Sequence, residues 1–194
     1  GFIKAGELPV KETNPLRPMS PYAVSKIAVD MLAFQYCQTY QIKTVITRAF
    51  NHTGPRANVQ TVAPRFAQQI AFIEANKQEP VITTGNLEPF RDFSDVRDIV
   101  KAYYLAVEKC EYGTPYNIGS GQAYQIKAIL DILLSLSSVK VKIEQDAALV
   151  RPEKVAKIVC DFSKFHLATG WKPSIALEKT LEDLLNYYRN ENAN

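Results

Sequence analysis

The 194-residue sequence has few of the residues that build metal sites or disulfide frameworks. Its three cysteines, Cys37, Cys110 and Cys160, include no close pair, and there are two histidines. This pattern excludes a Cys-X-X-Cys metal site and suits a reducing cytosol. No apolar run approaches the roughly 18 residues that a membrane-spanning helix needs, and residues 1–12 lack the apolar segment of a signal peptide. We therefore expect a soluble, cytoplasmic protein with no metal and no membrane partner.

The sequence also lacks a strong charge of either sign. Its 23 Lys and Arg residues and 20 Asp and Glu residues leave a formal net charge of +3 at pH 7. This excess is too small to indicate nucleic acid as a partner, and it is compatible with an anionic small-molecule substrate. With 46% apolar and 22% charged residues, the composition is typical of a globular protein with one sizeable core or two small lobes.

Helix-like and strand-like segments alternate along the chain. Apolar residues recur at helical spacing in segments 21–40, 63–76, 94–109, 126–136 and 176–189. Short β-branched or apolar segments, typical of strands, lie at 43–50, 80–84, 114–118 and 140–146. The alternation, with connections long enough for crossovers, predicts an α/β fold with a parallel sheet. We expect Met31, in the first helix, to lie in the core.

The segment SPYAVSK, residues 20–26, predicts a capped helix start that carries a tyrosine and a lysine on one face. A phenol, with an ordinary pKa of about 10, is a poor acid near neutrality. A nearby ammonium favours the phenolate form and makes proton exchange with a carbonyl or an alcohol feasible. Tyr22 and Lys26 are therefore a candidate catalytic pair. The same spacing also fits two surface side chains on an ordinary helix.

A polar loop, NHTGPR at 51–56, follows the strand predicted at 43–50. It stands at the carboxyl end of that strand, where open α/β sheets bind ligands. Asn51, His52, Thr53 and Arg56 offer donors for phosphate oxygens or a carboxamide. A plain turn built on Gly54 and Pro55 explains the spacing as well.

Three further features have a functional and a structural interpretation. The charge run 91–98 is expected to be mostly a solvated, internally paired surface, although Arg91 could reach a diphosphate. Arg151 invites the same interpretation. Residues 119–121, Gly-Ser-Gly, lack the third glycine of a GxGxxG loop and predict a strand-to-helix turn. We interpret His166 and the cysteines as structural.

Six segments in order carry a family resemblance: PLRPMSPYAVSK, TRAFNHTGPR, GNLEPFRDFSDVRDIV, YNIGSG, RP and TGWKPS. Together they span nearly the whole chain, and they resemble the nucleotide-sugar branch of the extended short-chain dehydrogenase/reductases, the NAD-dependent epimerase/dehydratase family. The loop 51–56 is similar to that of the GDP-mannose 4,6-dehydratases and the GDP-4-keto-6-deoxymannose reductases. The segments RDFSDVRDIV and TGWKPS look closest to the reductases.

The resemblance implies a reaction and a role for each candidate residue. The reaction is hydride transfer from NADP(H), or from NAD(H), to the C4 ketone of a GDP-4-keto-6-deoxy sugar. Tyr22 would donate the proton, and Lys26 would bind the nicotinamide ribose and favour the phenolate. His52 and Arg56 would lie near the cofactor. The residues implied to hold the nucleotide-diphosphate sugar are Asn51, Arg91, Arg151 and Glu153.

One position departs from the GDP-sugar pattern. Lys154 stands where those enzymes often have a glutamate that holds the nucleotide ribose, and Glu153 is expected to substitute for it. A GDP-mannose 4,6-dehydratase and a nucleotide-sugar epimerase remain alternatives. A nucleotide-sugar-binding module without catalysis is the alternative from another class.

The resemblance also predicts the architecture. Residues 1–60 would be the C-terminal part of a Rossmann-like cofactor domain, and 61–194 mainly a smaller mixed α/β substrate-binding lobe, with 94–120 returning to the Rossmann sheet. The chain has eight glycines and no GxxGxxG loop, so a C-terminal fragment of a longer enzyme is expected. The intact protein is expected to be a homodimer that pairs helices of the cofactor domain, including the one with Tyr22.

Overall fold

The computed structural model describes residues 2–150 and 155–193. Two of the predicted site residues, Arg151 and Glu153, lie outside the described residues. The helices are α1 (Pro21–Tyr40), α2 (Val62–Glu74), α3 (Val96–Lys109), α4 (Ile126–Ser135), α5 (Ser163–Thr169) and α6 (Leu177–Ala193). The strands are β1 (Ile46–Ala49), β2 (Asn51–Thr53), β3 (Val81–Thr84), β4 (Phe90–Asp95), β5 (Pro115–Ile118), β6 (Ala123–Gln125) and β7 (Lys142–Gln145). The described residues also form the 3₁₀ turns η1 (Ala5–Glu7) and η2 (Ala147–Leu149).

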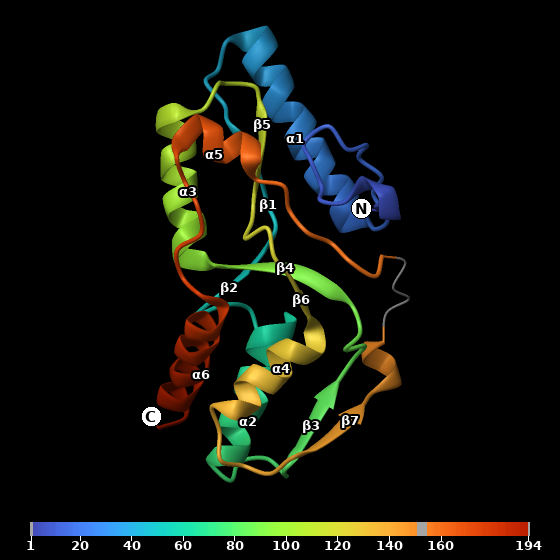
Figure 1. Cartoon of the computed structure of the whole chain (residues 1–194), viewed down its shortest axis with the longest axis vertical. Helices are drawn as coiled ribbons and strands as arrows, with labels where there is room; N and C mark the ends of the chain where they lie inside the picture. The colour runs from blue at the N-terminus through green and yellow to red at the C-terminus, as the bar shows by residue number, and fades with distance from the viewer. Residues whose placement is uncertain (1, 151–154, 194) are drawn as a thin grey trace.

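The strands form three small sheets in which parallel pairing dominates. β1 pairs with β5, β2 with β4, and β3 with β7, all in parallel, while β6 joins β4 in the antiparallel sense. The mixed α/β class with parallel strands, predicted from the alternation of segments, is confirmed. β4 crosses the middle of the elongated molecule and connects its two ends (Figure 1).

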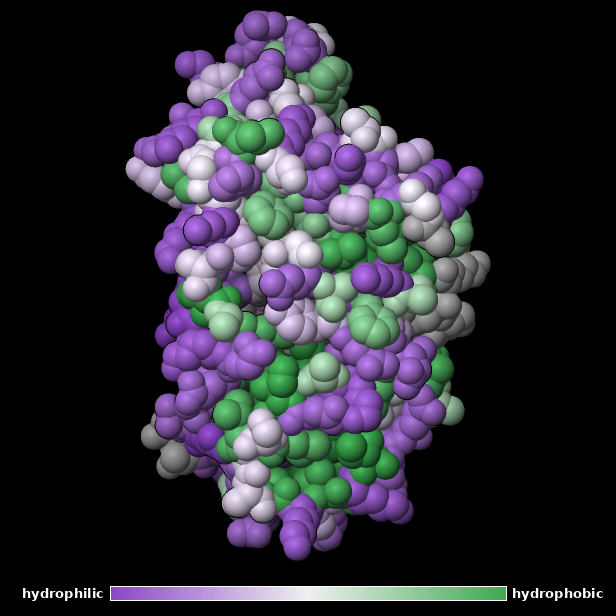
Figure 2. Space-filling view, viewed as in Figure 1, coloured by the Kyte–Doolittle hydropathy of each residue, from purple (hydrophilic) through white to green (hydrophobic). Residues whose placement is uncertain are grey.

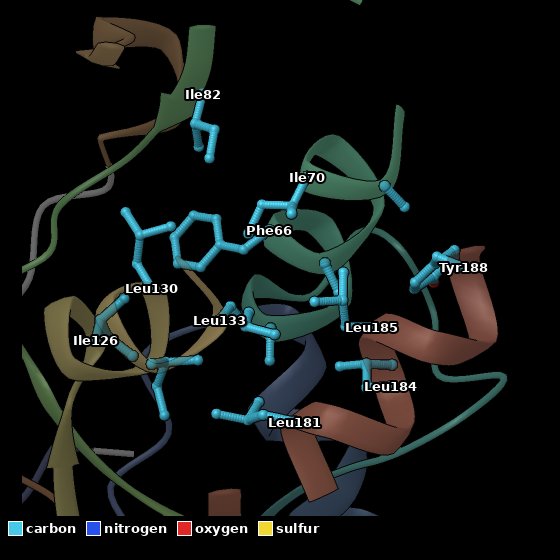
Figure 3. Packing of buried hydrophobic residues seen from close by; sticks show 14 of the residues in the cluster. Phe66, Ile70, Ile82, Ile126, Leu130, Leu133, Leu181, Leu184, Leu185 and Tyr188 are labelled. Atoms are coloured by element: carbon cyan, nitrogen blue, oxygen red, sulfur yellow. The ribbon is translucent and has the colours of Figure 1, made fainter. Parts of the chain in front are cut away.

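Two hydrophobic clusters lie apart along the long axis. One joins α2, α4 and α6 with Ile82 of β3 and Phe93 of β4, in the lower half of Figure 1. Figure 3 shows Phe66 of α2 pointing toward Leu130 of α4, with leucines of α6 on the other side of α2. The second cluster joins α3, β5 and α5 and includes Trp171. Each fully buried leucine or phenylalanine contributes about 1.5–3 kcal/mol, so each cluster stabilises its own end of the molecule.

Helix α1 begins as its sequence predicts but is packed differently. The Ser20 hydroxyl accepts a hydrogen bond from the Ala23 N–H at 3.2 Å, and Pro21 opens the helix. Within the described chain, no residue of α1 is buried. Met31, expected in the core, is 47% exposed, so that prediction is wrong. The apolar period of α1 marks a face suited to packing, but the described residues do not cover it.

The charge run at 91–98 is not a solvated surface. It forms β4 and the first turn of α3, and Asp92, Asp95 and Asp98 are 0%, 2% and 1% exposed. Each carboxylate is satisfied by hydrogen bonds, which makes its burial tolerable. Asp95 caps α3 by accepting from the Arg97 N–H at 2.7 Å, and it pairs with the Arg97 guanidinium. The Asp95–Arg97 pair matches the predicted internal pairing.

Asp98 fastens the C-terminal segment to the start of α3. Its carboxylate accepts from the Ser174 N–H and hydroxyl and from the Ile175 N–H, at 2.7–2.9 Å. Burial by itself raises the pKa of Asp98, but these hydrogen bonds outweigh it, and the pKa lies below its ordinary value. The Trp171 indole N–H donates to the Asp98 carbonyl oxygen at 3.1 Å. The TGWKPS segment therefore has a structural role: its contacts with Asp98 attach the chain to α3 just before α6 begins.

On the face seen in Figure 2, apolar side chains gather over the lower half, where α4 and β3 lie, between hydrophilic patches. They continue the first hydrophobic cluster to the surface, since partly buried apolar residues such as Ile132, Leu134 and Val141 pack against it. A cleft borders this cluster.

Candidate active site

The cleft has a volume of about 920 Å³, within the range of small-molecule sites, about 300–1,000 Å³. It is lined by residues from the start of α1, from β2, from the first turn of α2, and from β3, β4 and η2. The walls combine apolar side chains such as Phe66 and Phe93 with amide, hydroxyl and guanidinium groups. A wall of this composition is suited to a ligand with both a polar and an apolar part.

Four predicted site residues meet at this cleft: Tyr22, Asn51, His52 and Arg91. They come from three elements, and strand pairing brings two of these together, because Asn51 of β2 lies beside Phe93 of β4. Side chains alternate along a strand, and Arg91 and Phe93 both line the cleft, while Asp92 between them is buried in the protein. The sequence alone did not predict that β2 pairs with β4.

Tyr22 and Lys26 form the close pair that their spacing predicts. The Lys26 ammonium nitrogen lies 5.4 Å from the centre of the Tyr22 ring, within the distance at which a cation is attracted to an aromatic face. The Tyr22 side chain is 71% exposed and lines the cleft. Lys26 stands beside the tyrosine, outside the lining. The phenol is therefore accessible to a ligand in the cleft.

The segment 51–56, expected to be a loop, is a strand in its first half: Asn51–Thr53 form β2, and these three residues line the cleft. His52 Nδ1 lies 3.0 Å from the Phe50 carbonyl oxygen, and donation through this atom leaves Nε2 as an acceptor. Gly54 allows a close approach to α3, because a Cβ there would lie 2.7 Å from Val96 Cγ1. Arg56 is exposed and does not line the cleft. Its assignment to the cofactor stays a prediction.

Arg91 is placed by a buried clamp formed by its neighbour. Asp92 Oδ1 accepts from the Ser120 N–H and hydroxyl at 2.8 and 2.7 Å. Asp92 Oδ2 accepts from the N–H groups of Gly121 and Cys160, both at 2.9 Å. The clamp fixes β4, and with it Arg91, to segments far along the chain.

The Gly-Ser-Gly segment is confirmed as a turn, with a different role from the one predicted. It joins β5 to the short strand β6, and α4 starts directly after that strand. Gly121 takes a left-handed φ of 73°, and a Cβ there would lie 2.9 Å from the Phe162 ring. Both the backbone conformation and the close contact favour glycine.

Arg65 is a cleft residue that sequence reasoning missed. It lies in the first turn of α2, directly after the loop that contains Gln60 and Thr61, and all three line the cleft. A helix N-terminus carries partial positive charge, so Arg65 adds a full charge where an anion is already favoured. The available signal was an arginine in the first turn of a helix after a ligand-binding loop.

Within residues 2–150 and 155–193, no helix is long and apolar enough to cross a membrane. In the same residues, no group of three or more His, Cys, Asp or Glu side chains is arranged to hold a metal ion. Cys110 and Cys160 are buried, and burial raises the pKa of both thiols. His166 Nδ1 lies 2.9 Å from the Trp171 carbonyl oxygen, a contact suited to its structural interpretation.

Comparisons with known proteins support the resemblance carried by the six segments. The family model described as GDP-mannose 4,6 dehydratase matches residues 2–184. The chain is 32% identical to the GDP-6-deoxy-D-mannose reductase of Pseudomonas aeruginosa over 186 residues, which are 96% of this chain and 61% of that protein. It is 28% identical to GDP-mannose 4,6 dehydratase 1 of Arabidopsis thaliana, covering 92% of this chain and 49% of that protein.

Solved structures give the same result. The structure of RMD from Pseudomonas aeruginosa complexed with NADPH superposes with a TM-score of 0.93 at 31% identity, covering 98% of this chain and 63% of that one. The dTDP-glucose 4,6-dehydratase of Bacillus anthracis in complex with NAD superposes with a TM-score of 0.80 at 25% identity, over 93% of this chain and 55% of that one.

The chain spans roughly half to three fifths of the length of these relatives. The resemblance inferred from the six segments is confirmed, and so is the Rossmann-like α/β class. Since the family model covers almost all of its residues, the chain belongs to the GDP-mannose 4,6-dehydratase family, in the nucleotide-sugar branch of the extended short-chain dehydrogenase/reductases.

Proposed function

We propose that the protein reduces the C4 ketone of a GDP-4-keto-6-deoxy sugar with NADPH, or with NADH. The observation that carries the proposal is the meeting of Tyr22, Asn51, His52 and Arg91 at one cleft. The similarity to a GDP-6-deoxy-D-mannose reductase, 32% over 96% of the chain, favours this reaction within the family.

The residues present fit the reactive end of a nicotinamide cofactor. An accessible phenol with an ammonium beside its ring is the donor set that such an end needs: a proton donor for the substrate and a cation for the ribose hydroxyls. His52, at the edge of the same cleft, offers a ring nitrogen to the carboxamide. When bound, NADPH would supply the hydride to C4.

Tyr22 would complete the reduction on the substrate. As C4 gains the hydride, its oxygen develops negative charge, and the phenol donates its proton to that oxygen. The ketone thus becomes a secondary alcohol and the phenol becomes a phenolate. Lys26 would stabilise that phenolate electrostatically, since its ammonium lies beside the ring.

The diphosphate would lie against Arg91 and Arg65. Guanidinium groups match phosphate oxygens in geometry and charge, and both side chains line the same cleft. The Asn51 amide would orient the sugar between the diphosphate and Tyr22. We also propose, from the resemblance alone, that Arg151 and Glu153 hold the substrate.

The test is NADPH oxidation with GDP-4-keto-6-deoxymannose, measured on the protein as its gene encodes it. Tyr22→Phe should lower kcat about 100- to 10,000-fold and leave the substrate Kd within about threefold, because only the proton donor is lost. The matched control is Tyr40→Phe at the far end of α1, which should leave kcat unchanged. An unaltered kcat in Tyr22→Phe would refute the assigned role.

A 4,6-dehydratase is the second candidate, because the family model that matches residues 2–184 is described as GDP-mannose 4,6 dehydratase. Incubation with GDP-mannose and NADP⁺ discriminates between the two. A dehydratase releases a 4-keto-6-deoxy sugar without net cofactor consumption, whereas a reductase leaves GDP-mannose unchanged. Binding of the GDP-sugar without turnover in either assay would indicate a binding module.

Three further expectations remain proposals. One is the division into a cofactor part, residues 1–60 with 94–120, and a substrate-binding lobe. The others are a homodimer that pairs α1 with its copy, and a cytoplasmic location. The exposed apolar residues along α1, which include Val29, Met31 and Phe34, are compatible with such pairing.

A further inference from the structure

A forked ion pair connects α1 to β1. Arg48 of β1 donates from Nε and Nη2 to the two carboxylate oxygens of Asp30 at 2.7 and 3.0 Å. The two side chains are 20% and 10% exposed. A partly buried bidentate pair of this kind holds a defined geometry, unlike an exposed pair. Within the described residues no side chain of α1 is fully buried, and the pair is a directional contact that ties the helix to β1, beside the hydrogen bond from the Thr44 hydroxyl to the Ala33 carbonyl oxygen at 2.8 Å.

Asp30 lies on the same side of α1 as the candidate catalytic pair. Tyr22, Lys26 and Asp30 are spaced by four residues each, and such residues follow one another along one helix face. At 1.5 Å per residue, Asp30 lies about 12 Å along the axis from Tyr22. Fixing Asp30 therefore sets both the rotation of α1 about its axis and its position along that axis.

The other half of the pair lies on the chain segment that contributes Asn51 and His52 to the cleft lining. Arg48 is three residues before Asn51, and β1 passes into β2 within two residues. Arg48 Nη1 also donates to the Glu12 carbonyl oxygen at 3.0 Å. The Glu12 carboxylate accepts from the Asn117 N–H on β5 at 2.7 Å, so Arg48 is itself braced on both sides.

The geometry points to Arg48 and Asp30 as positioning residues that set the Tyr22–Lys26 face of α1 against Asn51 and His52. Neither side chain lines the cleft, so neither is a catalytic residue. This inference rests on the proposed function for its kinetic consequence, because a displacement of about 1 Å in a reacting group can cost about 100-fold in rate. The mechanical claim, that the pair restrains α1, does not depend on that function.

The test uses Arg48→Lys, which keeps the charge but loses the fork. We expect kcat to fall about 10- to 100-fold, while KM for the sugar nucleotide changes less than about threefold. Hydrogen exchange of the amides at 24–31 should rise at least about tenfold, since the helix loses its restraint. If Arg48→Lys does not fold, Asp30→Asn gives the same readouts with the side-chain size retained.

The matched control is Arg189→Lys. Arg189 also forks onto a carboxylate, that of Glu74, with two contacts of 2.7 Å, but it joins α6 to α2. The Arg189→Lys substitution should lower global stability. It should not raise hydrogen exchange in α1, and kcat should stay within about twofold of its original value.

The two readouts separate the inference from the proposed function. Unchanged exchange at 24–31 in Arg48→Lys overturns the restraint whether or not the protein is active. Raised exchange with an unchanged kcat in an active protein overturns the positioning role. If no sugar nucleotide is turned over by the unsubstituted protein, the proposed function fails, and the exchange data alone decide whether the pair restrains α1.

Discussion

Replacing Asp92 should cost the protein a large part of its stability. The carboxylate is completely buried and accepts four hydrogen bonds, two at each oxygen. In Asp92→Asn the retained oxygen can still serve Ser120, but the amide nitrogen then faces two N–H donors, those of Gly121 and Cys160. Two hydrogen bonds to a charged acceptor are lost, each contributing about 1.5–3 kcal/mol.

The expected loss is therefore about 3–6 kcal/mol, against a total of about 5–15 kcal/mol for a typical domain. Urea unfolding at pH 7, followed by tryptophan fluorescence from Trp171, measures it with an unchanged m-value. The control is Asp131→Asn, which removes an exposed pair with Lys127 and should change stability by less than about 0.5 kcal/mol. A loss below about 1 kcal/mol in Asp92→Asn would show that the clamp does not hold β4.

Two further predictions concern packing and pH. Gly119→Ala should destabilise by about 1–3 kcal/mol, because the new Cβ would lie 2.6 Å from that of Cys160, whereas Gly6→Ala meets nothing within 4 Å and should be nearly neutral; equal effects of the two changes in urea unfolding would contradict this. Hydrogen bonding from Arg189 lowers the pKa of Glu74 below its ordinary value, so the pair stabilises the fold above about pH 4.3 and loses that contribution as the pH falls. The stability difference between the natural protein and Glu74→Gln should therefore shrink from pH 6 to pH 3, and a constant difference would refute the linkage.

Five of the six helices in the described residues were predictable because their signals are local, whereas α5 (Ser163–Thr169) was not predicted. Ser20 with Pro21 marks the start of α1, and Asp95 caps α3, which begins at Val96 within the predicted segment 94–109. Helical apolar spacing and capping need no knowledge of distant residues. The position of Asn51 and His52 at a cleft was predictable for a related reason, since the carboxyl end of a parallel strand is where such sheets bind ligands.

β4 was not predictable in the same way. Its sequence, FRDFSD, has three charged residues among six, and charged residues are ordinarily exposed to solvent. What makes burial of Asp92 tolerable is a set of donors 28 to 68 residues away. The prediction for Met31 was wrong in the opposite sense, because this residue was expected in the core and is exposed. An apolar period shows that a helix face can pack, but not what covers it.

The alternation along β4 joins stability to the proposed chemistry. Arg91 lines the cleft, and the next residue, Asp92, is buried and holds the strand in place through its hydrogen bonds. A change at Asp92 should thus reach the cleft through the backbone of Arg91, and binding of the diphosphate should weaken even where the protein stays folded. The loss of affinity should be greater for a GDP-sugar than for an analogue without the diphosphate, because only the former needs the guanidinium. An equal loss for both ligands would mean that the clamp supports the fold alone and that Arg91 is held by other contacts.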